Sequence, residues 1–558
     1  MAESSHPQDG KLCDFLSGHD KEETRPIIES MEKQIDLRHE TTSNFPESSS
    51  PLENQTGFDL SKASPHLQDE TAPDSLESPS YLKDESVSDP PMAFSNLEDE
   101  IDSDPLKSSS HLENEAAPDI PKSPSHLENL PAELRFLVLS WMPDLPTLHS
   151  LVHASPVLHA QYREHRDTLL LTCLSRELDG YYVDAYATLM SRVAVLGRRR
   201  TDELCEEFLL KNYDVYLSGS KHTKDLTRPS GGQIRWMAAF HDSVARPIAR
   251  LYAKWALENL CKAAASETSS ISSSVSMEDA MSLTRSEEIR VYRAIYRFET
   301  YCHLFGHNKG TRVYGFRGDK ICDIFFGMFD PWDVEALASI YSFVKHKYDE
   351  IFDEVKEDVS DTNPRFRNPS SGLTLFDSWD LVTLHDEIMS GTAARGLRPL
   401  MRLLLIKDHE ALVEKTISTF ATDRDIDECL DEVLGWASQH ERRLTSPRFP
   451  TARDKLERKK ASMEFTGDGV PPISPPLAWV LLWNGKYSNV FGGFVPGILR
   501  EWGYVMWDEQ RWNNMGAKNL VNEQWKLHPE SLVETMETIV HWDPIGGAEG
   551  EESSQPPH

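Results

Sequence analysis

Three adjacent residues, His241, Asp242 and Ser243, are of the types that form a hydrolytic triad. In such a triad a serine attacks a carbonyl, a histidine takes the serine proton, and an acid orients the histidine. Adjacent positions on a helix point in different directions, so these three side chains cannot meet there. The serine also lacks the G-x-S-x-G surroundings of a nucleophile elbow. We therefore expect the three residues on a helix surface and not in a catalytic site.

Cys302, His303, His307 and Cys322 are of the types that bind zinc. However, Cys302-x4-His307 lacks a second pair at a suitable spacing, and Cys302 lies on the apolar face of a predicted helix. A cysteine in that position usually packs as a small apolar residue. We expect core packing and no metal site.

Phosphate binding and acid–base chemistry have equally little support. The glycine pairs at 231–232 and 492–493 belong to neither G-x-x-x-x-G-K-S/T nor G-x-G-x-x-G, the loops that cradle phosphates. Carboxylate pairs such as Asp427 and Asp431 are expected on exposed helix faces. The sequence therefore predicts a non-catalytic protein with no metal and no other cofactor.

The charge of this 558-residue chain is uneven. Residues 1–128 carry 9 basic and 29 acidic side chains, the remainder carries 49 and 62, and the net charge is −33. An acidic chain is poorly suited to nucleic acid, whose phosphates require a basic surface. No run approaches the roughly 18 apolar residues that span a bilayer, and the start of the chain does not resemble a signal peptide. We expect a soluble intracellular protein, cytoplasmic and/or nuclear and not secreted, with its seven cysteines reduced.

The acidic arm, residues 1–128, contains a repeat of 15 residues. Leucine recurs at this step in the series Leu37, Leu52, Leu67, Leu82, Leu97, Leu112 and Leu127, and acidic residues keep the same step. A short unit with one leucine, frequent proline and several acids cannot build a hydrophobic face, so we expect the arm to be disordered. Two roles remain open for it. It is either a multivalent tether with phosphorylatable serines or a neutral expansion that keeps the chain in solution.

From Leu130 onward, helical spacing replaces the repeat. The clearest example follows Asp330-Pro331, where apolar residues fall at steps of three and four: Leu337, Tyr341, Val344, Tyr348, Ile351 and Val355. Further helices are predicted over 157–178, 181–195, 201–217, 233–264, 289–305, 376–390, 396–420 and 425–440. Strand-like alternation is scarce. The predicted fold class is all-α, with an irregular multi-helical domain over 171–440.

The chain after residue 440 changes composition twice. Residues 441–476 are rich in proline and locally basic, which predicts a linker, and 543–558 is predicted to be a disordered tail. Between them, 477–542 is dense in aromatic residues: Trp479, Trp483, Tyr487, Phe491, Phe494, Trp502, Tyr504, Trp507 and Trp512. These residues form either a hydrophobic core or, alternatively, a site for a peptide or small ligand.

A leucine-rich motif at 129–170 stands between the arm and the helical domain. Its first helix opens at Pro131, and Leu134, Leu137, Val138 and Trp141 share one face of it. Two more short helices follow, interrupted by prolines. Three such helices cannot bury their leucines among themselves, so they need either the following domain or another protein.

The motif resembles an F-box, which begins L-P-x-E-L and continues through an apolar helix to D-L-x-x-L. The matching residues are Leu130, Pro131, Glu133, Leu134, Leu137, Leu139, Met142, Pro143, Asp144, Leu145, Leu148 and Leu151. The stretches 154–163 and 177–187 resemble a group of F-box-like proteins of filamentous fungi. Where F-box proteins usually have S-K-x-W, this chain has Ser155-Pro156-Val157-Leu158.

The resemblance implies a partner and a function. F-box proteins bind the small adaptor subunit of SCF-type cullin–RING ubiquitin ligases, and the rest of the chain selects a protein target. The residues that would meet the adaptor are Leu130, Pro131, Leu134, Leu139, Leu145, Leu148 and Leu151. Helices that bind in a groove use apolar anchors at such spacings.

The alternative is a non-catalytic interaction or scaffold protein with no ubiquitin-ligase link. In that case the three helices are a lid on the larger helical domain. Joint exposure of Leu134, Leu145 and Leu148 would favour a missing partner, and their burial in the chain's own core would favour the lid.

Overall fold

The computed structural model describes residues 125–197, 200–217, 228–267, 282–306, 317–359, 385–420, 430–437, 442, 450, 452–457, 459–460, 463–483 and 495–523. All of them belong to one compact unit, Asp89–His558. The other unit, Met1–Ser88, lies outside the described residues. So do the rest of the predicted disordered arm up to residue 124 and the predicted tail at 543–558.

The described part of the chain consists of helices joined by turns and contains no strand, which confirms the predicted all-α class. Within that part, no helix combines the length and the apolar character needed to cross a membrane.

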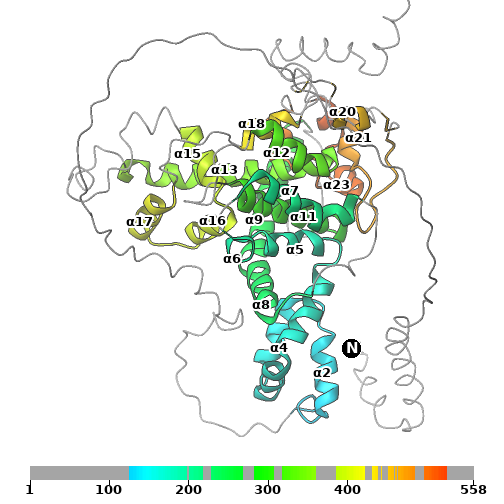
Figure 1. The fold of residues 1–558 in the computed structure, drawn as a ribbon, viewed down its shortest axis with the longest axis vertical. Coiled ribbons are helices and arrows are strands. Elements are labelled where there is room, and N and C mark those ends of the chain that lie inside the picture. Colours follow the sequence, from blue (N-terminus) through cyan, green and yellow to red (C-terminus); the bar gives the residue numbers. More distant parts are fainter. Residues whose placement is uncertain are drawn as a thin grey trace, which may run out of the picture. The chain divides into compact units, whose positions relative to one another are not determined.

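Three helices span the leucine-rich motif, and we call them the F-box-like region only because their sequence resembles that motif: α2 (Ala132–Ser140), α3 (Leu145–His153) and α4 (Pro156–Glu177). A proline stands just before α2 and in the first turn of α3 and α4, where a missing backbone N–H costs nothing. Asp144 caps α3 by accepting from the N–H of Thr147 at 2.7 Å, and Ser155 caps α4. Both α2 and α3 pack on α4, and α4 packs on α8 (Gly231–Phe240). Figure 1 labels α2, α4 and α8, which lie in the lower part of the view.

The arm ends in a turn that is fixed to this region. The N–H of Ser125 donates to the Glu128 carboxylate at 2.7 Å, and the N–H of Glu128 donates to the Ser125 hydroxyl at 3.3 Å. The Ser155 hydroxyl at the start of α4 donates to the same carboxylate at 2.6 Å. The point from which the arm leaves the helices is thereby set.

Two long helices run through the hydrophobic core: α11 (Arg285–Phe305) and α13 (Pro331–Val359). They pack on each other, and α11 also packs on α5 (Tyr182–Met190). Thr284 and Glu287 form a reciprocal capping box at the start of α11. The six residues predicted to share one face of α13 are all buried: Leu337, Tyr341, Val344, Tyr348, Ile351 and Val355. The sequence spacing therefore identified core residues of α13, although Trp332, Ile340 and Phe343 at other positions are buried as well.

The predicted helix over 233–264 contains an irregularity. It consists of α8, a π-helical turn (His241–Ala245) and α9 (Arg246–Glu267). A π turn adds a residue to one helical turn and shifts the register of everything after it, and such turns are frequent at functional sites.

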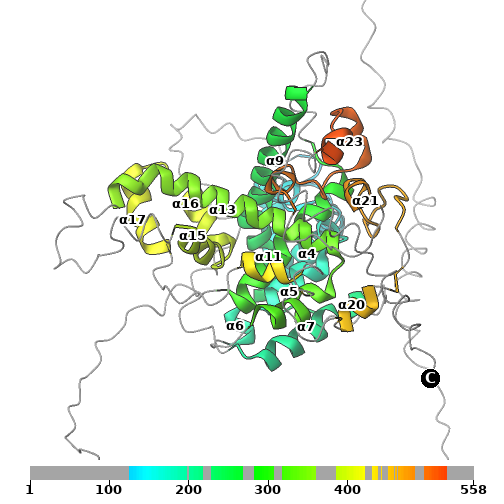
Figure 2. The same cartoon turned by 90° about the horizontal axis from the view of Figure 1, so that it is seen from above.

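The remaining helices surround these. They are α6 (Val193–Leu196), α7 (Asp202–Leu217), α12 (Gly318–Ile324), a 3-10 turn (Phe326–Met328), α15 (His385–Ala393), α16 (Leu397–Leu404), α17 (His409–Thr419), α18 (Leu430–Trp436), α20 (Ala452–Glu457), α21 (Leu477–Trp483), α22 (Gly497–Glu501), α23 (Glu509–Asn514) and α24 (Lys518–Glu523). The predicted helix 396–420 is divided into α16 and α17 because Asp408 caps a new helix there. Helices α15, α16 and α17 all pack on α13 (Figure 2), with Phe352 of α13 against His385 and Phe420.

The aromatic C-terminal segment belongs to the same core as the helices before it. Trp479, Trp483, Trp502, Tyr504, Trp507 and Trp512 are all buried in that core. Tyr487, Phe491 and Phe494 lie outside the described residues. Of the two alternatives for this segment, the buried residues favour the core over a ligand site.

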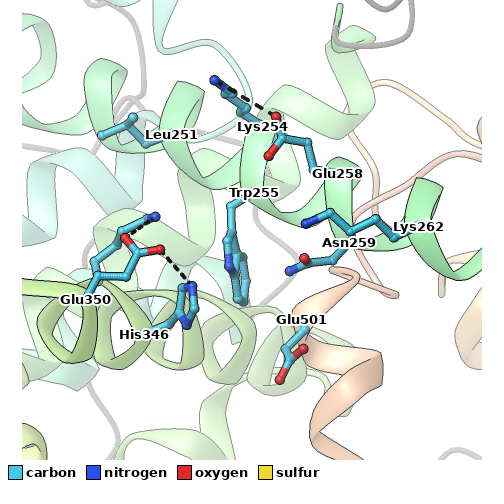
Figure 3. A pocket seen from close by; sticks show the side chains of 10 residues that line it. Leu251, Lys254, Trp255, Glu258, Asn259, Lys262, His346, Glu350 and Glu501 are labelled. Carbon is cyan, nitrogen blue, oxygen red and sulfur yellow. Dashed lines mark hydrogen bonds and ion pairs between the residues drawn. The ribbon is translucent and has the colours of Figure 1, made fainter. Parts of the chain in front are cut away.

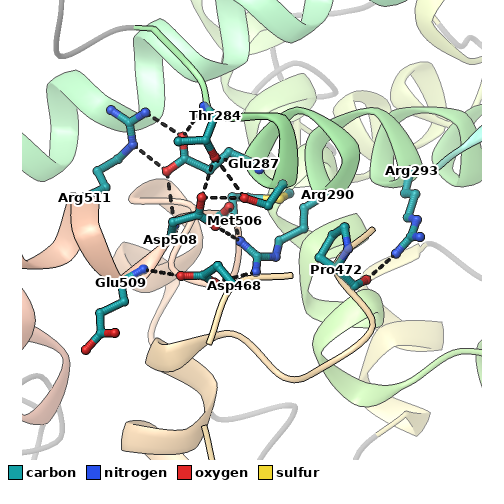
Figure 4. Close-up of polar contacts among 11 residues, drawn as sticks. Thr284, Glu287, Arg290, Arg293, Asp468, Pro472, Met506, Asp508, Glu509 and Arg511 are labelled. Carbon is teal, nitrogen blue, oxygen red and sulfur yellow. Dashed lines mark hydrogen bonds and ion pairs between the residues drawn. The ribbon is translucent and has the colours of Figure 1, made fainter. Parts of the chain in front are cut away.

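Buried ion pairs fasten this segment to α11 (Figure 4). Arg290 donates to Asp508 at 2.6 Å and to Asp468 at 2.8 Å. The N–H of Asp508 donates to Glu287 at 3.1 Å, and Arg511 pairs with the same carboxylate at 2.5 Å. Asp468 lies in the predicted linker 441–476, so this part of the linker is bound to the helical core.

Candidate protein-docking surface

Helix α2 and its C-cap residue Trp141 present a row of large apolar side chains that stay exposed among the described residues. Leu134 is 46% exposed, Leu137 41% and Trp141 61%. Positions 134, 137 and 141 are spaced by three and four residues and therefore share one face of the helix. We call Leu134, Leu137 and Trp141 the α2 stripe. A single exposed leucine is normal, whereas an apolar row on one short helix is typical of a protein-binding surface.

The opposite face and both ends of α2 hold the stripe in place. Leu139 is fully buried, and the Phe136 ring meets the His165 ring edge-on at 5.1 Å. Arg135 donates to the carbonyl of Leu130 at 2.6 Å, near the N-terminal end. Arg176 of α4 donates to the carbonyl of Ser140 at 3.1 Å, at the other end. A helix fixed in this way loses little conformational freedom when it binds.

Arg176 also contacts the stripe itself. Its guanidinium carbon lies 5.7 Å from the centre of the Trp141 ring, a distance at which a cation is attracted to the face of an aromatic ring. The ring of Trp141 is thus positioned while most of its surface stays open.

The structure divides the seven predicted adaptor-binding residues. Leu139, Leu145 and Leu148 are buried in the chain's own hydrophobic core, Leu130 and Leu151 are partly buried, and Pro131 and Leu134 are exposed. The seven therefore do not form one surface. Leu137 and Trp141 share the open face with Leu134 but were not among the seven. Their spacing from Leu134 was the sequence signal that could have added them.

The π turn brings His241 into the interior. Its Nδ1 lies 2.8 Å from the hydroxyl of Tyr296, and its Nε2 lies 3.1 Å from the carboxylate of Glu177. Asp242 instead pairs with Arg246, and the Ser243 hydroxyl donates to the carbonyl of Ala239 at 2.6 Å. The three side chains have different partners and form no triad. The expectation that all three lie on a helix surface is wrong for His241, because the π turn directs its ring into the interior toward Tyr296 and Glu177.

Glu177 is the centre of this polar cluster. It pairs with Arg246 and accepts from the N–H of Leu145 at 2.9 Å. Burial alone would raise the pKa of Glu177, but the hydrogen bond to His241 and the charge of Arg246 outweigh burial and lower the pKa to about 2. The carboxylate is therefore ionised and joins α3, α4, the π turn and α9.

The residues considered for zinc are dispersed. Cys302 and Cys322 are buried, and burial raises the pKa of the Cys302 thiol, which disfavours the thiolate that a metal requires. His303 lies 2.9 Å from the Ser191 hydroxyl, and His307 is outside the described residues. No group of three His, Cys, Asp or Glu side chains in the described ranges could hold a metal ion.

Only one of the glycine and carboxylate pairs lies fully within the described residues. The glycines at 231–232 open α8 behind the cap of Ser230. Gly492, Gly493, Asp427 and the side chain of Asp431 lie outside what the structure describes.

A hollow of about 430 Å³ lies between α9 and α13 (Figure 3). His346 and Lys347 both contact Glu350, at 3.0 and 2.7 Å, so opposite charges on this wall are already paired. A larger hollow, of about 730 Å³, lies between the F-box-like helices and α9.

Comparison with models of protein families, with curated proteins and with solved structures finds no match to this chain.

Proposed function

We propose that the protein is a non-catalytic substrate receptor of the F-box type. In this proposal the α2 stripe binds the adaptor subunit of an SCF-type cullin–RING ubiquitin ligase, and the helical body holds a protein target. The observation that carries the proposal is the open apolar row of Leu134, Leu137 and Trp141 on a firmly held helix. The choice of partner rests on the resemblance of residues 130–151 to an F-box.

The exposed area of the stripe limits the binding free energy that a partner can gain by covering it. Complete burial of a large apolar side chain contributes about 1.5–3 kcal/mol, and these three are roughly half exposed, so covering them contributes on the order of 3 kcal/mol. Micromolar binding requires about 8 kcal/mol. The adaptor must therefore cover more than the stripe, and the exposed Pro131, just before α2, is a further residue of the motif that is open to it.

The second candidate is an interaction protein without a ligase link. The burial of Leu139, Leu145 and Leu148 favours it, because these residues of the motif serve the chain's own core. The α2 stripe would then bind a different protein. The two candidates share a surface and differ in the partner.

Binding of the purified full chain to the purified adaptor, measured by calorimetry, tests the proposal. We expect Leu134→Glu to weaken binding about tenfold or more, a loss of about 1.4 kcal/mol or more, because a charge would have to be buried. The matched control is Leu210→Glu on α7, since Leu210 is a helical leucine that is 52% exposed away from the stripe. Lack of adaptor binding by the wild-type chain removes the ligase link, and equal binding by both variants removes the stripe as the site.

A further inference from the structure

The hollow of about 730 Å³ is a groove with a row of cations along one wall. Arg246, Arg250 and Lys254 line it from α9, at steps of four residues. Four residues of an α-helix rise about 6 Å, so the three charges follow one another along the groove. The opposite side comes from the connection between α2 and α3, the end of α4 and the start of α11.

Glu177 and Glu288 of this groove form ion pairs, whereas Asp144 and Arg176 bond to neutral backbone groups that leave their charges uncompensated. Glu177 binds Arg246, Glu288 binds Arg285 at 3.1 Å, and Asp144 caps α3. Arg176 donates to the carbonyls of Met142 and Ser140.

Two cations remain on α9. No carboxylate among the described residues forms an ion pair with Arg250, whose side chain is exposed. The Lys254 ammonium lies 3.9 Å from Glu258, at the outer limit of an ion pair, and is 62% exposed. The exposed Asp179 also lines the groove, and its negative charge offsets part of the positive charge of Arg250 and Lys254. The groove is therefore a locally cationic place on a chain whose net charge is −33.

We propose that this groove binds the Glu-x-Glu units of the chain's own acidic repeat, Glu113-Asn114-Glu115 and its copy Glu98-Asp99-Glu100. In an extended segment, residues two apart are about 6.6 Å from each other, close to the 6 Å rise between Arg250 and Lys254. One carboxylate of each unit can thus face each cation. Each unit follows a leucine, and the groove offers the apolar Ala249, Ala253 and Leu283 beside the cations.

The length of the chain between the acidic units and Ser125, where the described residues begin, decides whether the units can approach the groove. Ser125 is held at the N-terminal side of α2 through the turn that Glu128 forms with Ser155. Helix α2 spans about 13 Å, and Pro143, just beyond its other end, lines the groove. Glu115 lies ten residues before Ser125, and a chain of that length extends up to about 35 Å. The connection is therefore long enough to span α2 and bring the nearer unit to the Pro143 end of the groove without any movement of the helices.

Attachment to the same chain is what makes such a site effective. Exposed ion pairs are weak and are screened by salt, so a free peptide would bind poorly. A segment joined through a short connection meets its site at an effective concentration on the order of millimolar. This inference goes beyond the proposed function and does not depend on the adaptor.

Zero-length carbodiimide cross-linking of the full chain, read by mass spectrometry, tests the proposal. The reagent joins an amine to a carboxylate in contact with it, and Lys254 supplies the amine. We expect cross-links from Lys254 to Glu113 or Glu115 and to Glu98 or Glu100 at low salt. They should fall about fivefold or more in 1 M salt, where charges are screened within about 3 Å. Lys407, exposed in the connection between α16 and α17, is the reference amine and should give few of them.

Two pairs of matched variants sharpen the test. Arg250→Glu should reduce the Lys254 cross-links about fivefold or more, and Arg402→Glu, which reverses an exposed cation on α16, should not. In the arm, Glu98, Glu100, Glu113 and Glu115 are replaced by Gln. Lys254 should then form few cross-links with the acidic residues that remain in the arm. Neutralising Asp69, Glu70, Asp84 and Glu85 removes the same charge from adjacent-acid pairs and should leave the Lys254 cross-links unchanged.

Three results would overturn the proposal. The first is an even spread of the cross-links over Lys254 and Lys407, and the second is insensitivity to Arg250→Glu. The third comes from a mixture of isotope-labelled and unlabelled chains, where cross-links between the two kinds would place the acidic unit of a second copy in the groove.

Discussion

The backbone N–H of Leu145 donates to the carboxylate of Glu177 at 2.9 Å, so the first residue of α3 is bound to the last residue of α4. The same carboxylate contacts His241 of the π turn and Arg246 of α9. One side chain thereby connects the F-box-like helices to the helical body.

This connection predicts a loss of stability in acid. The folded-state pKa of Glu177, about 2, lies below its ordinary value of 4.5. Its contribution is therefore complete above about pH 4.5 and is lost as the pH falls toward 2. A shift of this size corresponds to about 3 kcal/mol. Glu177→Gln should unfold more easily in urea at pH 7, and the difference from the wild-type chain should shrink between pH 4.5 and pH 2. Parallel stability curves over this range would contradict the assignment.

The buried and the exposed leucines of the F-box-like region should differ in how much stability is lost when the side chain is shortened to alanine. Leu148 is 1% exposed, so Leu148→Ala should lower the free energy of unfolding by about 2–5 kcal/mol. Leu134→Ala should cost about 1 kcal/mol or less, because its side chain is already half in water. Denaturant titration of both variants measures the contrast. Similar costs at both positions would mean that Leu134 is covered by the chain itself.

The ion pair between Arg297 and Asp184 is the most deeply buried in the described part of α11, with side chains that are 2% and 0% exposed and 2.8 Å apart. Arg297 also contacts Asp333 at 2.9 Å. Removing one member of a buried pair leaves an uncompensated charge, which costs about 3–5 kcal/mol. Arg297→Met and Asp184→Leu should each lower stability by about this amount, and the double variant should lose clearly less than their sum. Additive losses in the double-mutant cycle would show that the two groups do not interact.

Asp508 should control how firmly the C-terminal segment is held. It accepts from Arg290 at 2.6 Å and from the Ser286 hydroxyl at 2.5 Å, and these bonds help to lower its pKa despite burial. Asp508→Asn should therefore speed amide hydrogen exchange over 495–515 about tenfold or more, corresponding to about 1.4 kcal/mol or more of local stability. Exchange in α2–α4 should not change. The exposed Asp179→Asn is the control, and a uniform increase across the chain would indicate global destabilisation instead.

Much of the fold could be predicted because helical periodicity is a local property. The spacing of apolar residues identified core residues of α13, and Asp330-Pro331 marked its start. The π turn at His241–Ala245 escaped prediction because one extra residue in a turn changes the hydrogen-bond partners and not the composition. The break between α16 and α17 was missed although Asp408, a common capping residue, stands there.

The candidate site was predictable only in part, for a different reason. Spacing indicates that Leu134, Leu137 and Trp141 share a face, but the direction of that face depends on what packs behind it. Leu139 fills the core while Leu134 does not, although both match the F-box pattern. The contacts of Glu177 with Leu145, His241 and Arg246 join positions far apart in the chain, and no spacing rule indicates such contacts.

The burial of Leu139, Leu145 and Leu148 has a consequence for how this region could be inherited. These side chains complete an interior that later helices also build. A recombination event that transplanted residues 129–170 into another gene would carry three leucines without their neighbours. In this protein, the segment that resembles a transferable domain depends on the later helices for its hydrophobic core.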